Sequence, residues 1–170
     1  MSALGPAFFA APFKQCAIVV HDLDSAVRRF VEQLGIGPWT GYRLGPPLLK
    51  DMLYDGEPVE FTFRHALAWD GETQFELIEP IEGPSIFADH LAIHGEGLHH
   101  IGKYVPDHSA AVSEALAAGF TPLQSARGFG AEGDGAFAYF RPPGGATIVE
   151  LISAPRVRIE PEFVYPANEP

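Results

Sequence analysis

The sequence predicts an α+β fold in which two tandem βαβββ modules form one structural domain. The first observation is an internal repeat, in which residues 15–27, QCAIVVHDLDSAV, align with residues 100–112, HIGKYVPDHSAAV. A second match joins residues 75–80, FELIEP, to residues 149–154, VELISA. Both halves therefore begin and end with similar strands, and such self-similarity indicates duplicated structural units.

The opening elements of each half follow from local signals. Short apolar runs over residues 16–20 and 101–105 predict the first strands. An Asp-rich cap follows each run and predicts helices near residues 23–34 and 109–118, each of about three turns. A helix end favours a left-handed residue, and two glycines stand at those positions: Gly35 and Gly119.

The closing elements of each half are predicted to be hairpins. In the first half, strand-like residues 59–69 and 73–80 flank an Asp-Gly turn. In the second half, residues 136–142 and 146–152 flank a Pro-Gly-Gly turn. The proline-rich residues 45–58 predict a short strand with loops.

These elements divide the chain into four ranges. We expect the first module over residues 13–82 and the second over residues 97–154. The linker, residues 83–96, has room for a short helix, and the C-terminal tail, residues 155–170, is expected to be irregular. A chain of 170 residues can fold as one domain with a substantial core.

Charge and hydropathy exclude several classes of partner. The chain has 22 acidic and 11 basic residues, and its formal net charge of −11 repels phosphate backbones and anionic lipids. We therefore expect neither nucleic-acid nor membrane partners. No apolar run approaches the roughly 18 residues that a spanning helix needs, and the first residues lack the basic start of a signal peptide. A soluble, cytoplasmic protein is expected.

The repeat selects one histidine of the pair His99-His100. Internal symmetry places His100 at the position of Gln15, on the predicted first strand of each module. Because neighbouring side chains on a strand point to opposite faces, at most one of the two histidines is expected to reach a single site. His99 is interpreted as a surface residue or as a support for the site.

Two glutamates occupy equivalent positions in the final strands of the two modules. Glu76 and Glu150 each stand between large apolar neighbours, where a carboxylate is costly to bury unless it is paired or bound to a cation. If the modules pack with pseudo-twofold symmetry, these glutamates converge with Gln15 and His100. Such nitrogen and oxygen donors suit Zn²⁺, Ni²⁺, Co²⁺ or Mn²⁺. For Gln15, a metal contact and a structural hydrogen bond both remain open.

Other side chains are weaker candidates for a site. Five histidines have no comparable placement and are interpreted as ordinary surface or core residues, although His94 lies close enough to a turn to reach the mouth of a pocket: His21, His65, His90, His94 and His108. Aromatic residues are candidates for an apolar pocket wall: Tyr104, Trp39 and one of Tyr139 or Phe140. Residues 41–58 are expected to govern specificity.

The segments AIVVHDLDSAVRRFVEQLGIGPW, FELIEP, GLHHIGKYVPD and IVELI together resemble the vicinal oxygen chelate superfamily. This superfamily includes glyoxalase I, methylmalonyl-CoA epimerase, extradiol dioxygenases and bleomycin resistance proteins. The resemblance implies a curved mixed sheet around a central cavity. It also implies metal ligands on the first and last strands of each module, at Gln15, Glu76, His100 and Glu150. Homodimers are common in the superfamily, and an exposed edge of the first strand would offer one route to a homodimer.

The set of Gln15, Glu76, His100 and Glu150 resembles the metal ligands of zinc-type glyoxalase I. Extradiol dioxygenases instead resemble a ligand pattern of two histidines and one carboxylate, with His at the first position. Gln15 at that position argues against this class. Glyoxalase I also uses two arginines to hold glutathione, and Val19 and Glu96 stand at those positions. The linker and the next strand resemble methylmalonyl-CoA epimerase, which usually has His at the position of Gln15. Coenzyme A needs basic contacts, for which the candidates are Lys14, Arg64, Lys103, Arg127 and Arg141.

Both relatives imply one reaction type. We expect a metal-dependent isomerase or lyase that moves a proton next to the carbonyl of a small metabolite or thioester, through a metal-stabilised enediolate. The resemblance to glyoxalase I makes Glu150 the first candidate for the base, with Glu76 returning the proton. The alternative is a non-catalytic binding protein of the bleomycin-resistance type. A third possibility is that the carboxylates serve only folding or dimerisation.

Overall fold

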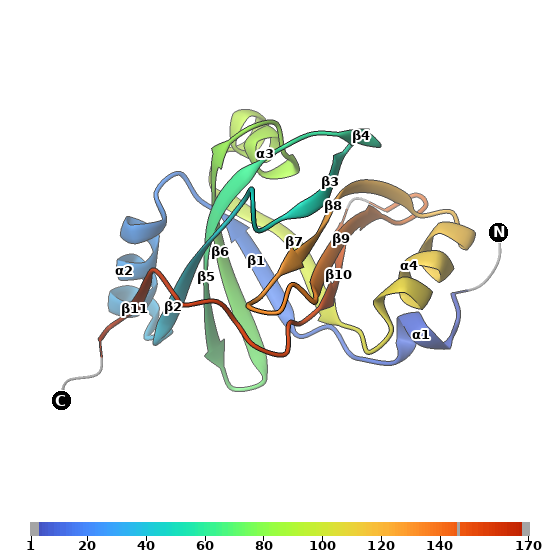
Figure 1. Cartoon of the computed structure of the whole chain (residues 1–170). Coiled ribbons are helices and arrows are strands. Elements are labelled where there is room, and N and C mark those ends of the chain that lie inside the picture. The colour runs from blue at the N-terminus through green and yellow to red at the C-terminus, as the bar shows by residue number, and fades with distance from the viewer. Residues whose placement is uncertain (1–3, 146, 168–170) are drawn as a thin grey trace.

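In a computed structural model, which describes residues 4–145 and 147–167, eleven strands form one mixed sheet that curls into a half-barrel, with four helices (Figure 1). The predicted α+β fold class is confirmed. The helices are α1 Pro6–Phe9, α2 Leu23–Leu34, α3 Ile86–His94 and α4 His108–Ala117. The strands are β1 Gln15–Val19, β2 Trp39–Leu44, β3 Lys50–Tyr54, β4 Glu57–Pro58, β5 Thr62–Asp70, β6 Thr73–Glu82, β7 Gly97–Tyr104, β8 Thr121–Phe129, β9 Gly135–Arg141, β10 Ile148–Ser153 and β11 Phe163–Tyr165.

The internal repeat reappears in the order of the strands. The sheet runs β11-β2-β5-β6-β1-β7-β10-β9-β8-β3-β4, so each half contributes four strands in the same relative order. The halves meet where β1 and β7 pair antiparallel, and each of these strands also pairs in parallel with the last strand of its own half. Strand β1 is therefore paired on both sides, and the exposed first-strand edge expected as a route to a dimer is absent.

The two long helices cover the outer faces of the two halves. Asp22 accepts a hydrogen bond from the Ser25 backbone at the start of α2, and Asp107 accepts one from Ala110 at the start of α4, as the Asp-rich caps predict. Helix α2 packs on the first half, whereas α4 and the short α1 pack on the second (Figure 1). No helix among the described residues has the length and apolar character needed to cross a membrane.

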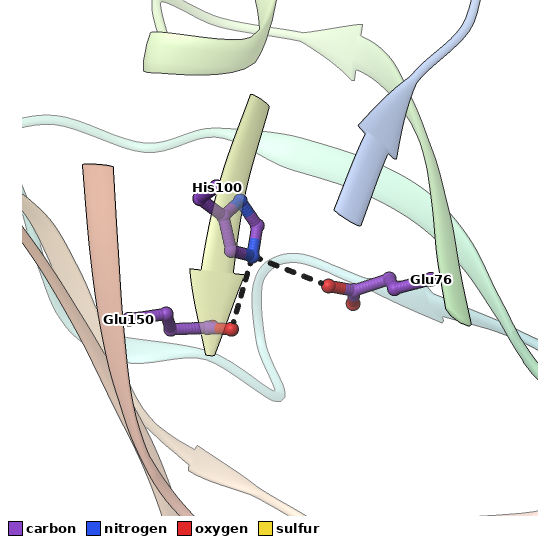
Figure 2. Close-up of side chains that lie close together, drawn as sticks. All are labelled: Glu76, His100 and Glu150. Carbon is purple, nitrogen blue, oxygen red and sulfur yellow. Dashed lines mark hydrogen bonds and ion pairs between the residues drawn. The ribbon is translucent and has the colours of Figure 1, made fainter. Parts of the chain in front are cut away.

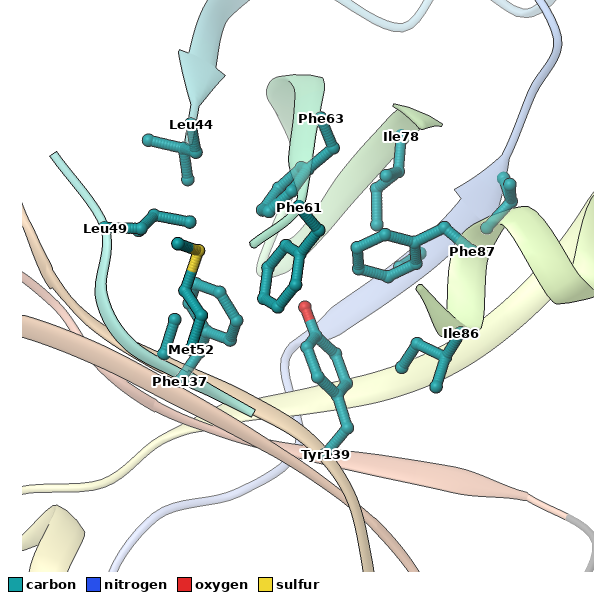
Figure 3. Packing of buried hydrophobic residues seen from close by; sticks show 13 residues of the cluster. Leu44, Leu49, Met52, Phe61, Phe63, Ile78, Ile86, Phe87, Phe137 and Tyr139 are labelled. Carbon is teal, nitrogen blue, oxygen red and sulfur yellow. The ribbon is translucent and has the colours of Figure 1, made fainter. Parts of the chain in front are cut away.

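The concave side of the half-barrel is filled by a cluster of buried aromatic and aliphatic side chains (Figure 3). Phe63 and Phe87 meet edge to face with ring centroids 5.1 Å apart, and Tyr139 lies 5.6 Å from Phe87. Such packing gives the inner face its own core. The candidate functional residues lie beside this core, which leaves only a small cavity next to them.

Two segments cross from one half to the edge of the other. Strand β3, which follows the first half's β2 in sequence, pairs with β8 of the second half. Strand β11, which follows the second half in sequence, pairs with β2 of the first. The two crossings are reciprocal, so each half supplies an edge strand to its partner half.

The tail was expected to be irregular, and for β11 that expectation is wrong. An edge strand presents unpaired backbone groups, and β2 offers them to the tail. The backbone of Glu162 donates to the Gly41 carbonyl at 2.8 Å. A side chain at Gly41 would overlap Phe163, because an added Cβ would lie 2.1 Å from its ring. The glycine therefore lets the tail approach the sheet. Residues 168–170 of the tail lie outside the described residues.

Candidate metal site

Three side chains with metal-ligand chemistry meet on the concave side of the sheet. Glu76 comes from β6, His100 from β7 and Glu150 from β10, and all three are buried. One ligand atom from each lies within 4.8 Å of the others. His100 Nε2 is 3.2 Å from Glu150 Oε2 and 3.5 Å from Glu76 Oε2, so the two carboxylates reach the imidazole from different strands (Figure 2). The convergence of these three residues follows the pseudo-symmetry that the repeat predicts.

Gln15 lies in the same cavity but makes a different kind of contact. Its Nε2 donates to Gln74 Oε1 at 3.1 Å, and Tyr104 donates to the same oxygen at 2.6 Å. This network orients the amide, and Gln15 Oε1 is buried with no hydrogen-bond donor among the residues that the structure describes. The structural hydrogen bond considered for Gln15 is therefore present on its nitrogen, while its oxygen stays available to a cation.

His65, which we interpreted as an ordinary histidine, contacts the cluster. Its Nδ1 lies 2.6 Å from Glu76 Oε1, and its side chain is buried. Hairpin register explains the contact: Leu67 pairs with Glu76 across β5 and β6, so His65 lies two residues away on the same face. The predicted Asp-Gly turn contained part of this signal. Counting outward from Asp70-Gly71 would pair His65 directly with Glu76, which puts both on one face, although the observed register is shifted by two residues.

His99 also turns inward, against the expectation of strict alternation. The β1–β7 register shifts at this point: His100 pairs with Ala17 and Leu98 pairs with Ile18, which leaves His99 as an extra residue. A bulge of this kind breaks the two-residue period and re-aims side chains. Both histidines are consequently buried, and their Nδ1 atoms lie 2.8 Å apart.

When His99 is neutral, it can act as the acceptor and His100 as the donor in the contact between the two rings. Burial, with the nearby His100 and His90, lowers the pKa of His99 to about 3. A neutral His99 can accept a hydrogen bond from His100 Nδ1–H, which leaves His100 Nε2 facing the two carboxylates. Metal-binding histidines are commonly oriented in this way by an acceptor on the other ring nitrogen.

The surroundings of the two glutamates shift their pKa values in opposite directions. Burial opposes the ionisation of Glu76, but hydrogen bonds from His100 and His65 outweigh it and lower the pKa of Glu76 to about 2. Burial raises the pKa of Glu150, partly offset by its hydrogen bond with His100. Burial also disfavours charge on His100, yet its contacts with Glu150 and Glu76 raise its pKa to about 9.

A divalent cation fits the donor set. Gln15 Oε1 is buried and lacks a hydrogen-bond donor among the described residues, and the buried Glu76 Oε2 has only the long 3.5 Å contact with His100 Nε2. An unsatisfied buried acceptor is costly, and a cation removes that cost. Two carboxylates, an imidazole and an amide oxygen form a nitrogen and oxygen shell that suits a transition-metal ion.

The space at the cluster is small. A cavity of about 30 Å³ is lined by Gln15, Glu76 and Glu150, together with His65 and the cation Arg158. A single water needs about 10–15 Å³ of such space, so the cavity has room for about two groups of that size. Cavities of about 610 and 650 Å³ elsewhere on the surface are lined by none of these five residues, so the candidate site does not lie in these larger cavities.

The aromatic predictions were right in part. Tyr104 and Tyr139 line the cavity. Trp39 does not, because it is buried between α2 and the sheet, where its Nε1 donates to the Ile36 carbonyl. Phe140 packs under α4 on the outer face. His94 lines a separate cavity of about 310 Å³ with His90 and His99.

None of the cations proposed for coenzyme A lines the cavity. Arg64 pairs with three carboxylates on the outer face, from Asp24, Glu79 and Glu162. Lys103 donates to the Phe8 carbonyl beneath α1, and Arg127 pairs with Asp51. The cation that does line the cavity, Arg158, lies in the tail and was missed because no motif marks it.

Comparison with known proteins places this geometry in a family. Residues 14–140 match the model described as Glyoxalase/Bleomycin resistance protein/Dioxygenase superfamily. The chain belongs to this superfamily. Its members typically use a divalent metal, and the Glu76, His100 and Glu150 cluster is the candidate position in this chain. A search of the curated proteins returned no match.

Solved structures share the fold of this superfamily member at low sequence identity. The methylmalonyl-CoA epimerase from Mycobacterium tuberculosis is 20% identical, with a TM-score of 0.58 over 92% of this chain and 93% of that chain. A Streptomyces coelicolor methylmalonyl-CoA epimerase variant in complex with 2-nitronate-propionyl-CoA is 21% identical, with a TM-score of 0.56 over 84% and 96%. A hypothetical protein from Bacillus halodurans C-125 is 22% identical, with a TM-score of 0.54 over 85% and 95%.

Proposed function

We propose that this superfamily member is a metal-dependent isomerase or lyase that transfers a proton at the carbon next to a carbonyl group. The observation that carries the proposal is the buried meeting of Glu76, His100 and Glu150 from three strands. Gln15 is proposed as the fourth ligand through its buried, unpartnered Oε1. Burying two carboxylates is costly for folding alone even with His100 and His65 beside them, which favours a site that takes a cation.

The two glutamates have environments suited to opposite ends of a proton transfer. A divalent ion held here would polarise a carbonyl oxygen and acidify the neighbouring C–H bond. Glu150 is the proposed base, because its raised pKa gives it more affinity for a proton than an exposed carboxylate has. Glu76 approaches His100 Nε2 from another strand. To return a proton on the other face, the ionised Glu76 must first take one up, either from Glu150 or from solvent.

The proposed substrate is a small carbonyl metabolite or the acyl end of a thioester. Similar folds support the thioester, since one neighbour is a methylmalonyl-CoA epimerase solved with methylmalonyl-CoA and NH4+. The cavity of about 30 Å³ admits only the reacting group, so any larger carrier would have to remain outside it.

Metal content tests this proposal directly. Elemental mass spectrometry of the wild type should find about one equivalent of Zn, Ni, Co or Mn, and His100→Ala should lose it. His108→Ala is the matched control, because His108 bonds the Leu151 carbonyl from outside the site. With metal bound, exchange of substrate C–H for solvent deuterium, followed by NMR, should depend on Glu150.

Absence of metal from the wild type would contradict the proposal. A wild-type protein that takes up none of the four ions, even after incubation with each, would overturn the enzyme proposal. A small-molecule-binding protein would then be the better description of the fold.

A further inference from the structure

The segment over residues 154–162, here named the strap, runs from β10 across to β11 at the open side of the half-barrel (Figure 1). It is held at both ends. Near its start, Arg156 Nε contacts Asp134 at 2.9 Å, and the Ala131 backbone donates to Val157. At its far end, Arg64 Nε contacts Glu162 at 2.8 Å. The strap therefore has a fixed course over the candidate site.

Arg158 lies in the middle of the strap and lines the cavity that contains Glu76 and Glu150. Its guanidinium sits 5.7 Å from the centre of the Tyr42 ring. Among the residues the structure describes, Arg158 forms no ion pair, whereas its strap neighbour Arg156 pairs with Glu132 and Asp134. No other lysine or arginine in the described part of the chain lines this cavity.

Arg158 is exposed to solvent at the edge of an acidic cavity, where its charge is free to meet a ligand. The chain carries a net charge of −11, so carboxylates are plentiful, yet within residues 4–145 and 147–167 none pairs with Arg158. If the proposed divalent ion balances Glu76 and Glu150, Arg158 leaves the loaded cavity with one net positive charge. An anion with one charge is the complementary ligand, and a guanidinium binds a carboxylate through two parallel hydrogen bonds.

We infer that Arg158 binds a carboxylate of the substrate, and that the substrate class is therefore a small carboxylic acid that carries a carbonyl group. This inference rests on the proposed function, because the carbonyl is the group that the metal site would hold. The cation–π contact with Tyr42 and the strap anchors hold the guanidinium beside the cavity. Arg158 is accordingly a residue that determines specificity.

A matched pair of probes tests the inference. The cobalt-loaded protein is titrated calorimetrically with 2-oxobutyrate and with its methyl ester, which has the same carbonyl group but no negative charge. The wild type should bind the acid at least about tenfold more tightly than the ester, the scale of a charge-assisted hydrogen bond. Arg158→Gln should reduce this preference to less than about threefold, with cobalt content unchanged.

Arg28→Gln is the control variant, because Arg28 stacks on Tyr165 at 5.8 Å and does not line the cavity. It should keep the wild-type preference. Equal affinity of the wild type for acid and ester, no binding of the acid, or an unchanged preference in Arg158→Gln would each overturn the inference. These failures differ from failure of the proposed function, which shows as absence of bound cobalt before any probe is added.

Discussion

The orientation of His100 depends on the side chain beside it in sequence. His99 presents a ring nitrogen 2.8 Å from His100 Nδ1, and its lowered pKa keeps it uncharged. The neutral ring can therefore act as the acceptor that fixes the His100 tautomer. His99 is in this sense a positioning residue, since it would act on a metal only through His100.

Substitution of His99 should weaken metal binding without removing a ligand. His99→Leu fills similar space but lacks the acceptor, and its affinity for Co²⁺ should fall by about 10–100-fold. His99→Asn places an amide oxygen near the former Nδ1 position and should recover part of the loss. Competition with a chromophoric chelator measures both affinities, and equal affinities in the two variants would contradict the role.

Metal affinity should also depend on pH through His100. Its contacts with Glu150 and Glu76 raise its pKa to about 9 in the metal-free protein, so a proton occupies the ligand nitrogen at pH 7. Binding must release this proton. The affinity for Co²⁺ should therefore rise by about tenfold per pH unit below pH 9 and level off above it. Chelator competition from pH 6.5 to 9.5 checks the slope, and a flat profile would contradict it.

At the scale of elements, strand β7 combines two departures from regular structure that shape the site. The bulge at His99 turns both histidines inward. Further along the same strand, Gly102 pairs with Gln15 of β1. Because Gly102 has no side chain, it leaves room for the Gln15 amide. An added Cβ at Gly102 would lie 2.3 Å from Gln15 Oε1. The strand therefore sets the position of the fourth proposed ligand.

Gly102→Ala should consequently affect the metal more than the fold. The methyl group would push the amide of Gln15 aside, and metal affinity should fall by about tenfold or more. Gly97→Ala is a control in the same strand, since its Cβ would meet nothing closer than 3.8 Å. Affinity measured by chelator competition should separate the two variants, and thermal unfolding should check that both are folded. Equal losses in both would exclude the proposed contact.

At the scale of the whole molecule, the candidate ligands come from both halves of the repeat. Gln15 and Glu76 belong to the first half, and His100 and Glu150 to the second. Reciprocal crossing of β3 and β11 links the same halves at the outer edges of the sheet. A bound metal would therefore add a cross-link at the centre of an already interlocked fold.

Metal removal should lower the stability of the whole chain. A ligand present at a hundred times its dissociation constant adds about 2.7 kcal/mol to the free energy of unfolding. For a chain of this size, that corresponds to a rise in Tm of roughly 5–10 °C. Calorimetry with Co²⁺ and after chelation should show this shift in the wild type and not in His100→Ala. An identical shift in both proteins would indicate binding elsewhere.

The repeat in the sequence carried the prediction of architecture and of the central cluster. Duplicated strands and helices must pack in equivalent ways, and the two-residue period of a strand assigns each side chain to a face. For that reason Glu76, His100 and Glu150 could be placed together before any contact was known. Their roles as ligands and acid–base groups remain predictions for the measurements above.

Only the tertiary structure brought in His65, His99 and Arg158. His65 depends on pairing register across a hairpin, His99 on a bulge that reverses the facing of one residue, and Arg158 on a tail that crosses between halves. Each of these depends on which backbone groups pair and where the chain crosses. The pairing and the crossing leave few backbone N–H and C=O groups unpaired over the whole sheet. The Asp-Gly turn indicates the face of His65, but no local pattern of residues marks the bulge at His99 or the crossing of the tail.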